Sequence, residues 1–421
     1  MKKRITITTL IFSIFISIAV TFSIVFAIMG VMYSNSLRTI AQSYSNALNN
    51  QPNALAGVNA GGLSEKVVQK LNEIDQVARK YYVGEIDDES LVDMAIRGYI
   101  VGLGDRHAAY MNEQDFSMST EENLGHSVGI GINVFYDNTL QGLYVINVNE
   151  GEPADVAGIV PGDVIVAVNG KSVAEAGYYG TINTIKQGKV GESFNVTVVR
   201  MPDYTVSEEI VLTRKEISII TVKERMLSAD VGYIEISEFN RSTSLEFITA
   251  LDNLKSEGAK KFIFDVRNNP GGDLVGINEV LDYLLPEGPI IRINSKSGNE
   301  EVIYSDKHEL VAPMVVICNG NTASAAELFT CALMDYDKAV SVGTVTYGKG
   351  TMQTVFPLSS GGAFSVSTAY YNPPYSDNYN EKGVFPDVQI ELPPELEARF
   401  YKMTDKEDVQ LMKALEIIND K

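Results

Sequence analysis

The hydrophobic pattern of the chain changes several times, and each change marks a different kind of segment. Residues 5–33 carry no charged residue, and a run of this length predicts a helix that can cross a bilayer. Residues 63–124 place apolar residues at helical spacing, which predicts a small helical domain. Residues 125–214 show short alternating stretches separated by turns, such as GLYVINV and FNVTVVR, and these predict an antiparallel β module.

Strands and helices alternate from residue 215 onward. The stretches VGYIEISEF, KKFIFDV and MVVICNG predict strands, and a helical pattern follows each of them. Such alternation predicts an α/β core over residues 215–392, against which the helical pattern of residues 393–421 is expected to pack. The predicted fold class is therefore multi-domain α/β, with an N-terminal transmembrane helix (1–33, including a short cytoplasmic stub), a linker (34–62), the helical domain, the β module, the core and the C-terminal helical segment.

The charges around the first apolar run predict its orientation. Three cations occupy positions 2–4, whereas only Arg38 follows the run closely, so the N-terminus should stay in the cytoplasm. Residues 26–30 make a poor signal-peptide cleavage site, which favours an uncleaved anchor. We therefore expect a single-pass protein of the bacterial cell membrane, with everything from about Ser34 onward outside the cytoplasm.

Composition argues against several kinds of partner. The net charge of -20 makes nucleic acid an unsuitable ligand, because phosphate binding needs a basic face. His107, His126 and His308 are scattered without metal-ligand spacing, so no metal and no other cofactor is expected. Cys318 and Cys331 lie in apolar stretches, which predicts buried free thiols rather than a disulfide.

The stretch NGNTASAAEL contains a candidate nucleophile, Ser324. Ser324 and Glu327 have the spacing of a capping box, so the serine could serve only to begin a helix. Asn321 and Thr322 are equally good caps and lie closer to the preceding turn, which would leave the Ser324 hydroxyl free in the first helical turn. A Ser-His-Asp triad is disfavoured, because His308 lies in a charged stretch typical of a surface loop.

Two further stretches could complete a catalytic site. In GTVTYGKGTMQ, Lys349 lies between two glycines. If it is enclosed there, its amine loses affinity for the proton and can act as a general base, and Gln353 could orient the amine. An exposed turn with a solvated cation is the alternative. The third stretch, DVRNNPGGDL, ends a strand in a glycine-rich turn whose backbone N–H groups could bind an oxyanion.

Together, NTASAAEL, GTVTYGKGTMQ and DVRNNPGG resemble the motif set of the carboxy-terminal processing proteases, the S41 family of Ser-Lys peptidases. The β module likewise resembles the PDZ domain that these proteases carry before their catalytic core. The resemblance implies Ser324 as nucleophile, Lys349 as general base and Gln353 as the residue that positions the lysine. It also implies two backbone donors for the oxyanion, for which we expect Ala325, next to the nucleophile, and Gly271.

The start of the PDZ-like module predicts a binding site for a peptide tail. Val128, Gly129, Ile130 and Gly131 form a glycine-containing loop that enters a strand. Such a loop can bind a C-terminal carboxylate through its N–H groups while the tail adds to the sheet as an extra strand.

These features lead to one functional hypothesis and one alternative. We expect a membrane-anchored serine endopeptidase that recognises the C-terminal tails of exported proteins and hydrolyses peptide bonds through an acyl-enzyme. The alternative is a catalytically silent PDZ adaptor that only binds such tails. The helical segments at both ends of the extracytoplasmic part could also pair two chains as a homodimer.

One stretch departs from the family pattern. DRHAAY, at residues 105–110, stands where these proteases commonly have Asp-Pro-His-Ser-x-Tyr. Because this stretch lies outside the expected site, we interpret His107 as a structural residue.

Overall fold

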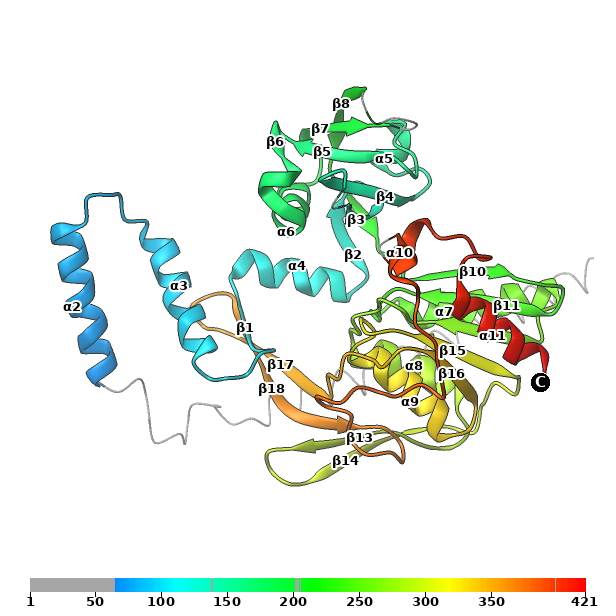
Figure 1. Cartoon of the computed structure of the whole chain (residues 1–421). Coiled ribbons are helices and arrows are strands. Elements are labelled where there is room, and N and C mark those ends of the chain that lie inside the picture. The colour runs from blue at the N-terminus through cyan, green and yellow to red at the C-terminus, as the bar shows by residue number, and fades with distance from the viewer. Residues whose placement is uncertain (1–64, 138, 201–203, 205, 398) are drawn as a thin grey trace, which may run out of the picture. The chain divides into compact units, whose positions relative to one another are not determined.

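The computed structural model describes residues 65–421, except 138, 201–203, 205 and 398, and at 179 only the backbone (Figure 1). The chain divides into two compact units, residues 1–88 and 89–421. The described part of the first unit is helix α2 (Glu65–Tyr81) and the turn after it. All the sheets that the structure describes belong to the second unit.

The predicted transmembrane helix requires a correction of the fold class. Residues 5–33 lie outside the described part of the chain. Within the described part, every helix is too short or too polar to span a bilayer. The described part of the chain is therefore a mixed α/β fold without a membrane-spanning helix. The location outside the cytoplasm, which depends on residues 5–33, stays a prediction.

Part of the predicted helical domain belongs to the core. Helices α3 (Asp88–Val101) and α4 (Glu113–Asn123) form as expected. Between them lies a short strand, β1 (Ala109–Met111), which pairs with strand β18 (Ala363–Asn372) of the core. This strand attaches residues 109–111 to the edge of a core sheet that the helical pattern did not indicate.

The β module forms a six-stranded sheet with two helices. Its strands are β3 (Ile132–Asp137), β4 (Gly142–Val148), β5 (Val164–Val168), β7 (Ser193–Val199) and β8 (Ser207–Thr213) in that order, with β6 (Lys171–Ser172) on β5. The helices are α5 (Pro153–Val156) and α6 (Val173–Lys186).

The stretch SVGIGINV forms two strands rather than one. Strand β2 (His126–Gly129) pairs with β9 (Lys215–Ser218), outside the main sheet of the module. Gly131 then turns the chain into β3 at φ 76°, a conformation that favours glycine. A Cβ at this position would lie 2.3 Å from that of Glu152, so the turn has no room for a side chain at position 131.

The core is built on a second six-stranded sheet. Its strands lie in the order β10 (Val222–Met226), β11 (Val231–Ile236), β12 (Lys261–Asp265), β15 (Met314–Cys318), β16 (Ala339–Gly343) and β19 (Val388–Gln389). All neighbours from β11 to β19 run parallel, and β10 is antiparallel to β11.

Helices cover both faces of this sheet. Helices α7 (Thr243–Glu257), α8 (Leu274–Leu284) and α9 (Ala325–Asp335) pack with Met314 and Val316 in one apolar cluster. Helix α11 (Val409–Asn419) packs with Val315 and Ile317 in another. Alternate residues of a strand point to opposite faces of its sheet. Because helices cover both faces here, all five residues of β15 are buried.

A five-stranded antiparallel sheet, which the sequence did not predict, completes the core. It consists of β13 (Gly288–Ser295), β14 (Glu300–Ser305), β17 (Thr351–Pro357), β18 and β1. Its strands mix polar and apolar residues, as in TMQTVFP, so their hydrophobic pattern is weak. The C-terminal segment adds α10 (Pro394–Glu397) and a 3₁₀ turn (Phe400–Lys402) before α11.

A buried ion cluster joins the C-terminal segment to strand β12. Arg267 is only 7% exposed. Its guanidinium donates to Asp265 Oδ1 at 3.0 Å, to Asp408 Oδ2 at 2.7 Å and to Gln410 Oε1 at 3.0 Å. The two carboxylates compensate the charge that burial would otherwise make costly. The cluster therefore holds the turn after β12 against the C-terminal segment.

We predict that Asp408→Ala lowers the free energy of unfolding by about 3 kcal/mol, because it leaves the buried Arg267 charge only half compensated. Urea unfolding would measure the loss. The control is Asp405→Ala, which removes a solvent-exposed pair with Arg225 and should cost less than about 1 kcal/mol. Equal losses in the two variants would contradict a structural role for the cluster.

Candidate active site

Ser324 lies at the junction between strand β15 and helix α9. It is the N-cap residue of α9, which begins at Ala325, so the prediction that Asn321 or Thr322 begins the helix is wrong. Thr322 instead donates its hydroxyl to the carbonyl of Val266 at 2.8 Å. Ser324 has φ 56° and ψ -119°, a sparsely populated conformation for a residue with a side chain. The surrounding contacts must therefore hold it in place.

The turns after β12 and β15 are joined by asparagine side chains. Asn268 Oδ1 accepts from the side-chain amides of Asn319 and Asn321, each at 2.9 Å. The Asn268 N–H donates to Asn319 Oδ1 at 2.9 Å, and the Ala323 N–H donates to the carbonyl of Asn269 at 2.9 Å. Because β12 and β15 are parallel neighbours, their carboxyl ends meet at one edge of the sheet. This brings two of the three predicted motifs together.

The carboxylate of Glu327 connects the third motif to the first. Glu327 is fully buried. Its Oε2 accepts from the backbone N–H groups of Ser324 and Lys349, each at 2.8 Å. Its Oε1 accepts from Gly348 N–H at 2.6 Å and from the hydroxyl of Thr346 at 2.5 Å. One side chain thus fixes the backbones of the candidate nucleophile and the candidate base.

The surroundings of Lys349 lower the affinity of its amine for a proton. Burial lowers the pKa of the Lys349 amine, while the carboxylates of Glu327 and Asp105 partly oppose this shift. In the part of the chain that the structure describes, its ammonium makes no hydrogen bond or ion pair. A lowered pKa favours the neutral form of an amine, whose nitrogen lone pair can accept a proton as a general base.

The stretch around Asp105 belongs to this site, contrary to the interpretation of the sequence. Burial lowers the pKa of His107, and the nearby charge of Lys349 lowers it further. Asp105 accepts from the N–H of Ser367 at 2.8 Å and from its hydroxyl at 3.1 Å. No catalytic signature in DRHAAY could have indicated this, because β1 carries the segment to the site only through strand pairing with β18.

Gln353 lies on strand β17 beside the same group. Its side-chain amide donates to Ser367 Oγ at 3.1 Å and to Thr351 at 3.1 and 3.2 Å. Among the described residues no hydrogen bond joins it to Lys349. A chain of contacts therefore runs from Asp105 through Ser367 to Gln353.

The predicted oxyanion donors differ in their availability. Ala325 is the first residue of α9, where backbone N–H groups have no partner within the helix. The N–H of Gly271 already donates to Asn269 Oδ1 at 2.8 Å. Gly271 nevertheless packs directly against the site, since a Cβ there would lie 2.7 Å from that of Ser324.

The neighbouring Gly272 is better placed as a donor than Gly271. The carbonyl of Gly271 accepts from Phe239 N–H at 2.8 Å. In a trans peptide the following N–H points the opposite way, so that of Gly272 points away from Phe239. Within the described part of the chain it has no hydrogen-bond acceptor.

The cysteines are free thiols in the interior, as predicted. Burial raises the pKa of both Cys318 and Cys331 to about 12, so neither supplies a thiolate near neutral pH.

His308 packs on the ring of Tyr283, with ring centroids 4.6 Å apart.

The predicted carboxylate loop leads into strand β3, at the edge of the main sheet of the β module. The N–H groups of Ile130 and Gly131 have no acceptor among the described residues, while their carbonyls accept from Ala154 and Asn149. Val128 and Gly129 belong to β2 and pair with β9. The free donors are therefore those of the second half of the predicted loop.

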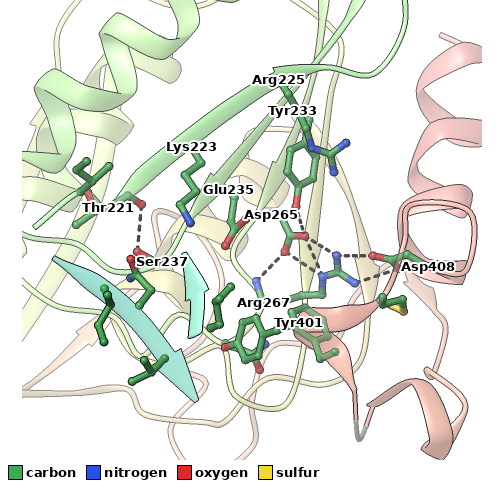
Figure 2. Close-up of a pocket in the computed structure, with 18 of the residues that line it drawn as sticks. Thr221, Lys223, Arg225, Tyr233, Glu235, Ser237, Asp265, Arg267, Tyr401 and Asp408 are labelled. Atoms are coloured by element: carbon green, nitrogen blue, oxygen red, sulfur yellow. Dashed lines mark hydrogen bonds and ion pairs between the residues drawn. The ribbon is translucent and has the colours of Figure 1, made fainter. Parts of the chain in front are cut away.

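A cavity of about 460 Å³ lies beside strand β3, and Figure 2 shows residues that line it. Strand β3 and helix α6 line it on the side of the β module, and strands β10 and β11 of the core line it opposite. Lys223 and Glu235 lie side by side there as paired positions of β10 and β11. Burial raises the pKa of Glu235. The cavity thus combines an apolar groove with charged groups from the core.

Comparison with known proteins identifies the families of three segments of the chain. The profile of peptidase family S41 matches residues 230–390, that of the PDZ domain matches residues 117–198, and that of the "Activating protease CtpB N-terminal domain" matches residues 18–115. A PDZ domain joined to an S41 core defines a serine-type peptidase.

Relatives identify the family. The chain is 31% identical over 343 residues to the carboxy-terminal processing protease CtpA of Bacillus subtilis, covering 81% of this chain and 72% of the relative. It is 29% identical over 390 residues to a carboxy-terminal-processing protease of Bartonella bacilliformis, covering 90% and 85%. The chain belongs to the carboxy-terminal processing proteases of peptidase family S41.

A solved structure has the same fold. An S41 protease from Bacteroides fragilis superposes with a TM-score of 0.55 at 15% identity, over 82% of this chain and 97% of that one. At this identity the likeness concerns the fold alone.

We predict that Glu327→Gln lowers kcat/KM by about 100-fold, because a small displacement of catalytic groups has an effect of this size. The amide nitrogen of glutamine cannot accept from the N–H groups that the Glu327 carboxylate holds. A peptidase assay with thermal melts would measure both effects. Glu309→Gln is the control, since it changes a glutamate that accepts one bond from Lys338. Full activity in Glu327→Gln would contradict this role.

Proposed function

We propose that the chain hydrolyses peptide bonds near the C-terminal tails of its substrates through a Ser324–Lys349 dyad. The observation that carries the proposal is the buried Glu327 carboxylate, which binds the backbone N–H groups of both residues. Such a contact would fix the distance between the two backbones. The lowered pKa of Lys349 adds the chemical property that a base needs.

The reaction would proceed by acyl transfer. The neutral amine of Lys349 accepts the Ser324 proton while Oγ forms a bond to the scissile carbonyl carbon. The N–H groups of Ala325 and Gly272 would stabilise the oxyanion, with Gly272 taking the place expected for Gly271. The carbon–nitrogen bond then breaks as Lys349 returns the proton to the leaving amine. Water, activated by the same lysine, hydrolyses the serine ester.

The described arrangement corresponds to a resting state in this proposal. The Lys349 ammonium is not hydrogen-bonded to Ser324 in the described part of the chain. The backbones of both residues are fixed, so rotation of the lysine side chain would complete the dyad. Gln353 would then accept a hydrogen bond from the amine and hold it toward the serine, as the family resemblance implies.

The groove between β3 and α6 would bind the tail. An extended peptide can add to β3 as a further strand, and the free N–H groups of Ile130 and Gly131 can donate hydrogen bonds to its terminal carboxylate. A further proposal is a homodimer, supported by the exposed apolar side chains Val68, Leu71 and Ile74 on α2.

A silent adaptor is the second candidate function, since the groove alone would account for tail binding. The contacts of Glu327 argue against it, because a scaffold needs no buried carboxylate between a serine and a lysine. Binding of tail peptides without turnover would favour the adaptor.

We predict that Ser324→Ala and Lys349→Ala each reduce cleavage of an unfolded protein with an apolar C-terminus by at least about 1,000-fold. Tail-peptide binding should be unchanged, because the groove is separate from both residues. The measurement is gel or mass-spectrometric detection of products beside equilibrium binding of the peptide. Undiminished cleavage by either variant would exclude the dyad.

We predict that kcat/KM rises with pH, because only the neutral amine of Lys349 accepts the serine proton. The midpoint should lie below the ordinary lysine pKa of about 10.4. Asp105→Asn should move it to lower pH, because the Asp105 carboxylate stabilises the ammonium. The control is Asp252→Asn on helix α7, whose side chain is 65% exposed. A midpoint that Asp105→Asn leaves unchanged, or raises, would contradict this assignment.

A further inference from the structure

Tyr371 on strand β18 contacts both members of the proposed dyad. Its side chain is 5% exposed. Its hydroxyl lies 3.1 Å from Ser324 Oγ and 2.9 Å from the backbone carbonyl oxygen of Lys349, and donates to both. No other side chain of the described residues hydrogen-bonds to Ser324 Oγ. The nucleophilic oxygen therefore has a specific neighbour that the sequence did not reveal.

The Tyr371 hydroxyl is suited to donate a proton without losing it. Burial raises the pKa of Tyr371 well above its usual range. Tyr379, which packs edge-on against it with ring centroids 6.0 Å apart, donates its own hydroxyl to the carbonyl of Ser324 at 3.2 Å. Among the other titratable groups nearby, Glu327 carries a negative charge that also disfavours a phenolate. Tyr371 thus remains a neutral donor throughout the reaction.

The Tyr371 hydroxyl has one proton and two acceptors. Its hydrogen bond to Ser324 Oγ can therefore be stronger in the transition state than in the resting state. In the resting state the proton is shared between Ser324 Oγ and the neutral carbonyl of Lys349. When Oγ loses its own proton to Lys349, it becomes the stronger acceptor. Hydrogen bonds to an anionic oxygen are shorter and roughly twice as strong as neutral ones. An interaction that strengthens in the transition state increases the rate.

We propose that Tyr371 is a further catalytic residue, whose hydroxyl donates to Ser324 Oγ and stabilises the negative charge that develops there during attack. The proposal rests on Ser324 being the nucleophile. Tyr371 transfers no proton: the serine proton passes to Lys349, and the bond from Oγ to the carbonyl carbon forms. The second contact, to the backbone carbonyl of Lys349, holds the hydroxyl in position beside Ser324 Oγ.

The test is the variant Tyr371→Phe, which removes the hydroxyl and keeps the ring. We expect kcat on an unfolded protein substrate to fall about 10- to 100-fold, as for the loss of one transition-state hydrogen bond. KM should be unchanged, because the hydroxyl does not touch the tail groove. The matched control is Tyr336→Phe, which removes a hydroxyl that donates to the Pro289 carbonyl at 2.9 Å and should leave kcat unchanged.

A second variant separates this role from folding. In thermal melts, Tyr371→Phe should destabilise the wild-type chain more than it destabilises the Ser324→Ala variant, since the alanine lacks the acceptor. Additive effects would overturn the proposal, and so would an unchanged or increased kcat in a folded Tyr371→Phe protein. An increase would mean that Tyr371 restrains the serine. Full activity of Ser324→Ala would instead refute the proposed function, so the two failures are distinguishable.

Discussion

The buried carboxylate of Glu327 is the contact on which the site depends. It accepts the N–H of Ser324 from the turn after β15 and the N–H of Lys349 from the turn after β16. Ser324 has a strained backbone, and such a conformation persists only where its surroundings determine it. A fully buried ion is stable only when its oxygens are satisfied, so the carboxylate, the strained serine and the lysine turn require one another.

The parallel sheet supplies the geometry for this contact. Strands β12, β15 and β16 are neighbours, and the turns at their carboxyl ends carry the three motifs. The asparagine contacts of Asn268 and the ion cluster of Arg267 hold the first turn from two sides. Rigid turns matter here because a serine hydroxyl is a weak nucleophile unless its base and its oxyanion donors are already in position.

Segments from outside the α/β sheet complete the surroundings of the lysine. Strand β18 places the Tyr371 hydroxyl within hydrogen-bond distance of Ser324 Oγ. The same strand carries Ser367, whose hydroxyl links Asp105 to Gln353. Asp105 and Glu327, which are more than two hundred positions apart, thereby both lie near the Lys349 amine. The helical pattern of the N-terminal region gave no indication of this, because a three-residue strand is too short to show a period.

The sequence by itself determined that a PDZ domain precedes an S41 core. It also determined the strands and helices with strong periodicity and the three motifs that the proposed site uses, because each depends on residues close together in the chain. Only the tertiary structure decided that Ser324 is the N-cap of α9, that the Gly271 N–H is engaged by Asn269, and that Asp105, His107 and Tyr371 lie at the site. These features arise from strand pairing and long-range hydrogen bonds, and neither has a local signature in the sequence.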